Sequence, residues 1–318
     1  MKSRKRIAAL CGGVGGAKLA LGLASLDTDI DVSIIANTGD DFEHLGLSIS
    51  PDIDTIAYTL AGLANPKTGW GRAEETWSFM ESLADLGGET WFRLGDKDLA
   101  LNVLRTNLLH DGASLSEVTS LITEKLGISA EIVPMSDSDV RTVLKTDLGA
   151  LDFQDYFVRL QCTPVVSSIE FKGAENSRPS TRFEELLTNQ EVDAFVICPS
   201  NPYISIDPIL AVPTVRAALA NHPAPVIAIS PLVDGQSIKG PTSKLMSELD
   251  LGSSAGDIAA YYHDFIDGFV LDHRDSPLCV EIERIGIQPF CSNIVMSTFD
   301  DRCRLARDVV RFAGVLTA

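Results

Sequence analysis

The sequence predicts an α/β fold: a doubly wound, mostly parallel, Rossmann-like sheet that carries a largely helical insertion. Two observations support this prediction. Residues 7–36 follow the order strand, glycine-rich turn, helix, strand, which is typical of a right-handed βαβ unit. The same alternation returns after residue 193, and helical patterns dominate the stretch between. A chain of 318 residues, 45% of them hydrophobic, is long enough to bury a core of this size.

The first unit is predicted from three short segments. Residues 7–11 are an apolar run that ends in glycines, as expected of a strand buried on both faces. Residues 17–26 have helical periodicity, and residues 31–36 form a second apolar strand. Two parallel strands therefore end at the same edge of the predicted sheet.

The later part of the chain repeats this pattern. We expect strands at residues 193–198, 225–230 and 267–272, because each is a short apolar run. Helical periodicity marks residues 206–220 and a closing helix at about residues 300–316. These segments complete a doubly wound layout.

The middle of the chain differs from both ends. Helical patterns occupy most of residues 51–127, and two segments, residues 130–135 and 141–146, look like strands of a small side sheet. We therefore assign residues 1–50 and 150–318 to a Rossmann-like nucleotide-binding core. Residues 51–149 are assigned to a mainly helical insertion that closes over the carboxyl edge of the sheet.

Composition narrows the classes of partner. The formal net charge of −18 repels nucleic acids and anionic membranes, so neither is an expected partner. None of the six cysteines forms a Cys-x-x-Cys pair, and no apolar run approaches the length of a membrane span. Together with a start that lacks the apolar core of a signal peptide, these features lead us to expect a cytoplasmic protein.

A glycine-rich loop, GGVGGAK at residues 12–18, stands where the first strand meets the first helix. Glycines at a helix amino end let a phosphate approach bare backbone amides. The loop is not a Walker A motif, because Leu19 stands where the magnesium-binding hydroxyl belongs. It also lacks the dinucleotide fingerprint, since Lys18 replaces the third glycine and Asn37 replaces the acid after the second strand. The sequence predicts a phosphate site of another kind, although a glycine turn without a ligand is the alternative.

Acidic residues follow at the same predicted edge. Asp40 and Asp41 come after the second strand, and Asp52 and Asp54 open a helix. Carboxylates beside a diphosphate repel it unless a cation lies between, and Mg²⁺ characteristically uses one or two carboxylates together with phosphate oxygens. We expect Asp41 and Asp54 to bind Mg²⁺ and to act in catalysis. The alternative for Asp52 is that it complements the helix dipole.

The glycine loop is the first of a series of motifs that follow one another along nearly the whole chain. The others are residues 37–41, 51–55, 68–71, 91–100, 104–107, 134–137, 153–159, 198–202, 229–231, 239–241 and 261–265. Together with the glycine loop they resemble the CofD family, the 2-phospho-L-lactate transferases of deazaflavin coenzyme (F-420) biosynthesis. The resemblance implies a magnesium-dependent transferase that is commonly a homodimer. Its donor would be a guanosine diphosphate carrying a small phosphorylated acid, and its acceptor the deazaflavin Fo. The terminal ribityl hydroxyl of Fo would attack the β-phosphorus of the donor and expel GMP.

Candidate site residues divide between the two ligands. Those expected to contact the nucleotide lie in the glycine loop or just after strands: Gly12, Gly13, Gly15, Gly16, Asn37, Ser200, Asn201, Ser230, Lys239 and Gly240. The resemblance assigns Asp54 and Arg93 to the acceptor. Arg105 and Trp91 join them, because positive charges are rare around this acidic stretch and an indole can stack on a flat ring. For Arg93 the alternative is a structural ion pair with Asp96 or Asp98, and for Lys239 a solvated loop.

Two other functions are alternatives to a transferase. A non-catalytic nucleotide-sugar-binding regulator of the same fold would share the glycine loop, but its second acidic motif reads approximately Pro-Gly-Asp-x-Arg rather than PDIDT at residues 51–55. An NAD-linked oxidoreductase is disfavoured by Lys18 and Asn37. The sequence leaves open which acid the donor carries (phospholactate, phosphoenolpyruvate or 3-phosphoglycerate), which carboxylate is the general base, and the dimer geometry.

Overall fold

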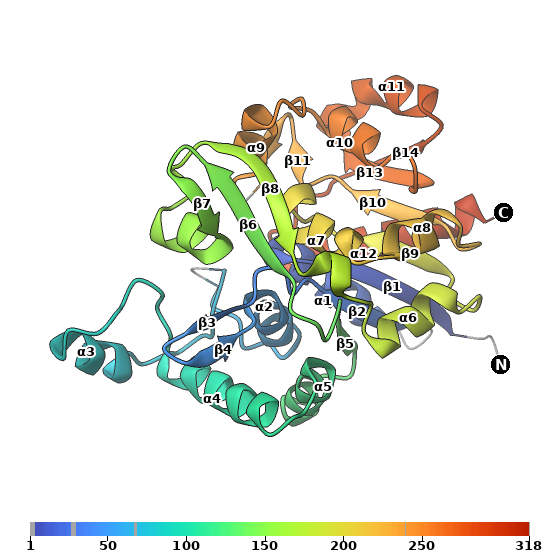
Figure 1. Ribbon diagram of the computed structural model, residues 1–318. Helices are drawn as coiled ribbons and strands as arrows, with labels where there is room; N and C mark the ends of the chain where they lie inside the picture. The colour runs from blue at the N-terminus through green and yellow to red at the C-terminus, as the bar shows by residue number, and fades with distance from the viewer. Residues whose placement is uncertain (1–3, 27–29, 67–68, 239, 318) are drawn as a thin grey trace.

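The central sheet has seven strands that pair in parallel, which confirms the predicted doubly wound parallel fold; five of the seven were predicted as its strands. The computed structural model (Figure 1) describes residues 4–26, 30–66, 69–238 and 240–317. In spatial order the strands are β14 (Gln288–Ser292), β13 (Gly268–Asp272), β10 (Val226–Ile229), β9 (Ala194–Ile197), β1 (Lys5–Cys11), β2 (Ile30–Ala36) and β5 (Glu131–Pro134). The chain runs outward from β1 in one direction and then resumes at β9 on the other side, so the topological switch point lies between β1 and β9.

Strand β1 shows why this sheet is buried on both faces. Its side chains alternate between two hydrophobic clusters: Ala8 and Leu10 belong to one, and Ile7, Ala9 and Cys11 to the other. All five are at most 3% exposed. An uninterrupted apolar run is therefore what a central parallel strand requires.

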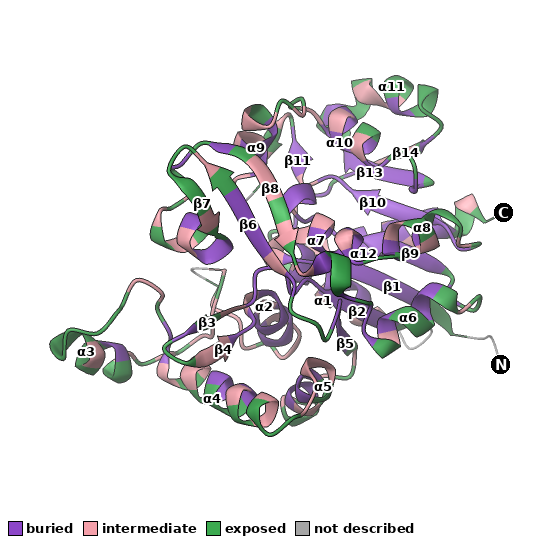
Figure 2. Cartoon of the chain, in the orientation of Figure 1, coloured by how far each residue is buried: buried purple, intermediate pink, exposed green. Residues whose placement is uncertain are grey.

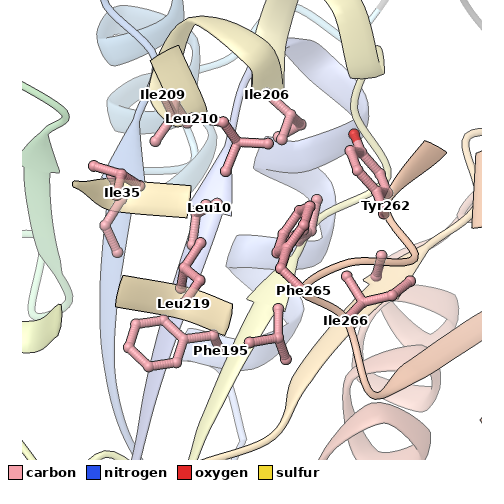
Figure 3. Packing of buried hydrophobic residues seen from close by; sticks show 14 of the residues in the cluster. Leu10, Ile35, Phe195, Ile206, Ile209, Leu210, Leu219, Tyr262, Phe265 and Ile266 are labelled. Carbon is pink, nitrogen blue, oxygen red and sulfur yellow. The ribbon is translucent and has the colours of Figure 1, made fainter. Parts of the chain in front are cut away.

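Helices cover both faces of the sheet. On one face lie α1 (Gly13–Ala24), α2 (Pro51–Leu60) and α12 (Phe299–Leu316). On the other lie α6 (Thr181–Thr188), α7 (Asp207–Ala211), α8 (Val215–Ala220) and α10 (Ala255–Tyr261). Figure 3 shows the second layer, where Leu10 and Phe195 of the sheet meet Leu219 of α8. Burial of these apolar side chains is the main stabilising contribution to the fold.

The side sheet differs from the prediction in one strand. Residues 141–146 do form β6 (Arg141–Thr146) of a three-stranded antiparallel sheet with β7 (Gly149–Asp152) and β8 (Val166–Lys172). Residues 130–135 were expected beside it, but β5 pairs in parallel with β2 at the edge of the main sheet. Periodicity identified the strand correctly and carried no information on its partner, because pairing depends on tertiary packing.

The predicted insertion is largely helical. It contains α3 (Ser78–Asp85), α4 (Asp96–His110) and α5 (Leu115–Lys125), and a short hairpin of β3 (Phe42–His44) and β4 (Leu47–Ile49) precedes it. Helix α3 lies farthest from the sheet in Figure 1 and is mostly exposed in Figure 2. Helix α2 and strand β5 pack within the layers of the sheet itself, so the division into nucleotide core and acceptor-side insertion remains a proposal about function. Among the described helices, none combines the length and apolar character that a membrane crossing needs.

Candidate active site

A cavity of about 680 Å³ opens at the carboxyl ends of the strands, across the switch point. Its walls come from both halves of the sheet and from the insertion. Segments that follow β1, β9, β10 and β14 form one side, and residues of α2, α4 and the loop before α4 form the other. Parallel strands end at one edge, which is why motifs far apart in the sequence converge here.

The glycine loop forms the start of α1, and its glycines serve different purposes. Gly13 has a positive φ of 64°, and no atom lies within 4 Å of where its Cβ would be. A Cβ at Gly15 would collide with the carbonyl oxygen of Pro199, and one at Gly16 would lie 2.6 Å from Ser200 Oγ. Gly13 is therefore the open position, whereas Gly15 and Gly16 allow close packing against β9.

Ser200 fastens this loop to the neighbouring strand end. Its hydroxyl donates to the carbonyl oxygen of Gly12 at 2.8 Å and accepts from the Gly12 amide at 3.2 Å. Asp52 Oδ1 accepts from the Gly13 amide at 2.6 Å. Two side chains thus hold the amino end of α1, and they already accept from the amides of Gly12 and Gly13.

Four aspartates lie beside the loop, each at most 7% exposed: Asp40, Asp41, Asp52 and Asp54. All but Asp41 line the cavity. Asn37 is fully buried, and its Nδ2 donates to Asp52 Oδ2 at 3.0 Å and to Asp40 Oδ1 at 3.3 Å. The structure therefore places Asn37 behind the aspartates, where it orients them, and not on the cavity wall where a nucleotide contact was expected.

Burial dominates the titration of these carboxyl groups. Desolvation raises the pKa of Asp41 to about 7 and that of Asp52 to about 6. It also raises the pKa of Asp40, where the charge of Asp52 adds to the effect, and the pKa of Asp54. Carboxylates gathered in this way need compensating positive charge to stay ionised, and Arg105 supplies part of it at Asp54.

Asp41 has one carboxylate oxygen that a hard cation such as Mg²⁺ could use. Asp41 Oδ2 accepts from Ser50 Oγ at 2.7 Å, while its Oδ1 is buried without any partner. A buried, unpaired carboxylate oxygen next to other carboxylates is the kind of ligand that Mg²⁺ uses. Among the described residues no group of three or more acidic, His or Cys side chains forms a ready-made metal cage, so substrate oxygens would have to complete the coordination.

Arg105 is the buried partner of Asp54. It is 1% exposed, its Nη1 donates to Asp54 Oδ2 at 3.1 Å, and its Nη2 forms an ion pair with Asp54 Oδ1. Asn102 Oδ1 accepts from the same guanidinium at 2.6 Å. Arg105 does not line the cavity, so the structure does not bring it to the acceptor side as the sequence suggested; it holds Asp54 from behind.

Aromatic side chains form the insertion side of the cavity. Trp70, Trp91, Phe92 and Arg93 all line it. The guanidinium of Arg93 lies 4.1 Å from the ring centre of Trp77, a cation–π contact in place of the ion pair with Asp96 or Asp98 considered from the sequence. A flat ligand can therefore contact indole, phenyl and guanidinium groups on one wall.

Of the remaining residues expected to contact the nucleotide, some line the cavity and others do not. Asn201 and Gly240 line the cavity, and Asn201 Oδ1 also accepts from the amides of Tyr203 and Ile204. Ser230 is fully buried and its hydroxyl bonds to both backbone groups of Leu232, so it forms a turn away from the wall. Lys239 lies outside the described residues.

Several lining residues were missed from the sequence. Tyr58 and Asp98 share a hydrogen bond of 2.6 Å, and residues 294–297 close the cavity beyond β14. Asp98 lies inside the segment 91–100 that was singled out, but no pattern set it apart from Asp96. Residues 294–297 carry no motif, because their position follows only from the strand order.

Comparison with known proteins extends this description. The family model described as "2-phospho-L-lactate transferase CofD" matches residues 7–285. The chain is 37% identical to the phosphoenolpyruvate transferase of Streptomyces griseus, over 98% of this chain and 100% of the relative. It is also 37% identical to the 2-phospho-L-lactate transferase of Methanopyrus kandleri, over 98% of each chain. A solved structure of a UPF0052-family protein from Bacillus halodurans matches with a TM-score of 0.63 at 13% identity, over 98% of this chain and 100% of that one, and so supports the fold alone.

Proposed function

This chain belongs to the CofD family of 2-phospho-L-lactate transferases, and we propose that it transfers a phosphorylated hydroxyacid from a guanosine diphosphate donor to the deazaflavin Fo. The product would be a phosphodiester on the ribityl chain of Fo, and GMP would be released. This is a step of coenzyme F-420 biosynthesis. The proposal includes dependence on Mg²⁺.

One observation carries the proposal: a single cavity joins the glycine loop, three of the four aspartates beside it and the aromatic wall. The loop with Pro199, Ser200 and Asn201 offers backbone groups to a diphosphate, and the opposite wall offers rings to a planar acceptor. A transferase must hold donor and acceptor within reach of each other, whereas a regulator that binds one nucleotide needs no second site.

The residues can be assigned to the chemistry as follows. The ribityl oxygen of Fo forms a bond to the β-phosphorus, the bond from that phosphorus to the GMP oxygen breaks, and the hydroxyl proton leaves to a base. The amino end of α1 would hold the diphosphate. Asp41 and Asp54 would hold Mg²⁺, which would neutralise charge on the phosphate oxygens and on departing GMP.

The acid on the donor stays open between close analogues. The relatives from S. griseus and M. kandleri are named for phosphoenolpyruvate and 2-phospho-L-lactate, and this chain is 37% identical to each. Mass spectrometry of the product formed from Fo and each guanylated donor, 3-phosphoglycerate included, would distinguish them.

Arg93→Ala tests the acceptor assignment. We expect weaker Fo binding and turnover, with GDP binding nearly unchanged, because Arg93 lies on the aromatic wall while the guanosine is assigned to the glycine-loop side. Fo fluorescence titration with and without GDP measures both effects. Arg311→Ala, at an exposed ion pair on α12, is the matched control.

Two results would count against the proposal. If the wild-type protein binds GDP but neither binds Fo nor forms a phosphodiester with any donor, the regulator function takes its place. If turnover persists in the presence of EDTA, the magnesium mechanism fails while the transferase assignment stands.

A further inference from the structure

Asp98 is a carboxylate on the cavity wall whose surroundings are incomplete. It lies in the first turn of α4, where Glu75 Oε1 accepts from the Asp98 amide at 2.9 Å and Glu75 Oε2 accepts from the Lys97 amide at 2.8 Å. Tyr58, from α2, donates its hydroxyl to Asp98 Oδ1 at 2.6 Å. Both Asp98 and Tyr58 line the cavity. The backbone and one oxygen of Asp98 are thus held in place.

The second oxygen of Asp98 receives no donor from the residues that the structure describes. No hydrogen bond within the described part of the chain reaches Asp98 Oδ2. The guanidinium of Arg105 is already paired, because both of its terminal nitrogens bond to Asp54. Because Asp98 is only partly buried and lines the cavity, this oxygen is available to a donor that enters the cavity, whether water or the hydroxyl of a ligand.

The charges around Asp98 separate its role from that of Asp54. Burial raises the pKa of Asp98 to about 7, with further increases from the charges of Asp54 and Glu75 and a decrease from the hydrogen bond of Tyr58. Burial raises the pKa of Asp54 as well, but there the paired Arg105 guanidinium opposes the rise. Both terminal nitrogens of Arg105 bond to Asp54, whereas the side chain of Asp98 accepts a hydrogen bond from Tyr58 at one oxygen and keeps its other oxygen for a hydroxyl on the cavity side.

We propose that Asp98 Oδ2 binds the attacking ribityl hydroxyl of the acceptor and takes its proton as the new phosphorus–oxygen bond forms. The proton passes from the ribityl oxygen to the carboxylate, and the electron pair of the breaking phosphate bond leaves with GMP. Tyr58 is a positioning residue that fixes the orientation of the carboxylate. The inference rests on the proposed function, because that function supplies the hydroxyl.

Asp98→Asn is the first test, because the amide keeps the shape of the side chain but cannot take a proton. We expect the kcat of the transfer reaction to fall by about 100-fold or more while the Kd of Fo changes less than about threefold. Tyr58→Phe should lower kcat by about five- to tenfold, since Asp98 keeps its charge but loses its orientation. Asp111→Asn, an exposed aspartate at the other end of α4, is the matched control and should leave both constants unchanged.

An acceptor analogue that lacks the attacking hydroxyl distinguishes a direct contact between Asp98 and that hydroxyl from a role of Asp98 in supporting the fold. Asp98→Ala should weaken binding of Fo, but should not weaken binding of the analogue whose terminal ribityl hydroxyl is replaced by hydrogen. A purely structural role would weaken both equally, and that result overturns the inference, as does an Asp98→Asn enzyme that retains more than about a third of the wild-type kcat. If the wild-type protein itself forms no phosphodiester, the proposed function fails and the inference fails with it. If the wild type and the Asp98→Asn variant both form the phosphodiester at similar rates, only the inference is refuted.

Discussion

At the scale of single residues, the buried pair of Arg105 and Asp54 is the most consequential contact near the cavity. Both side chains are at most 9% exposed, and the guanidinium meets the carboxylate through two nitrogens. Such a pair recovers its own desolvation cost only through good geometry and extra hydrogen bonds, which Asn102 provides here. Removing one partner leaves the other buried and charged.

We therefore predict that Arg105→Met destabilises the protein by about 3–5 kcal/mol, measured as the free energy of unfolding in urea. The double variant Arg105→Met/Asp54→Asn should be more stable than Arg105→Met alone, because the unpaired charge is gone. If Arg105→Met unfolds like the wild type and only Fo binding suffers, Arg105 contacts the acceptor directly, as the sequence suggested.

At the scale of elements, the start of α1 shows two different uses of glycine. Gly13 needs the left-handed region of φ and has open space around it, whereas Gly15 has no room for a side chain next to Pro199. The loop is therefore both a ligand surface and the packing contact between α1 and the end of β9.

Alanine substitutions should separate these uses. Gly15→Ala should lower the free energy of unfolding by about 1–3 kcal/mol through overpacking against the Pro199 carbonyl. Gly13→Ala meets no clash and should cost about 1–2 kcal/mol of backbone strain, with a larger relative loss of GDP affinity because its backbone faces the cavity. Urea unfolding and calorimetric GDP titration of the two variants, side by side, measure both quantities; equal GDP affinity in the wild type and Gly13→Ala would remove this position from the site.

At the scale of the whole molecule, buried acids link stability to pH. Burial raises the pKa of Asp41 and Asp98 to about 7 and of Asp52 and Asp207 to about 6, against an ordinary value of 3.8 for an aspartate. Between about pH 4 and pH 7 the folded state therefore holds more protons than the unfolded chain, and folding stability falls as the pH rises through this window. The net charge of −18 adds self-repulsion in the same direction.

Without divalent metal, we predict that the free energy of unfolding decreases from about pH 5 to pH 7.5, by at most about 1.4 kcal/mol per pH unit for each titrating group. Millimolar MgCl₂ should restore stability at pH 7.5 and do little at pH 5, because protonated carboxyls bind no cation. Urea titrations at both pH values test this, and Asp41→Asn should reduce both the slope and the magnesium effect. A stability that rises with pH, or one that ignores Mg²⁺ at pH 7.5, would contradict the prediction.

Local patterns were sufficient to recognise six of the seven strands of the main sheet, all but β14, and to gather the glycine loop and the aspartates at one edge. Residues 7–11 and 31–36 could be recognised as strands because a short, unbroken apolar run fits a sheet covered on both faces. Parallel strands then place the following loops together, whatever the rest of the chain does. The fold class and the approximate position of the cavity follow from these facts alone.

The direction of each buried polar group was decided only by the tertiary structure. Asn37, Ser230 and Arg105 have the residue types of ligand contacts, yet none of them lines the cavity and each bonds to another protein group. Tyr58 and Asp98 meet across two helices, and β5 joins the main sheet although its sequence suits either sheet. Periodicity records whether a position is buried, whereas which buried group faces which depends on packing between segments far apart in the chain.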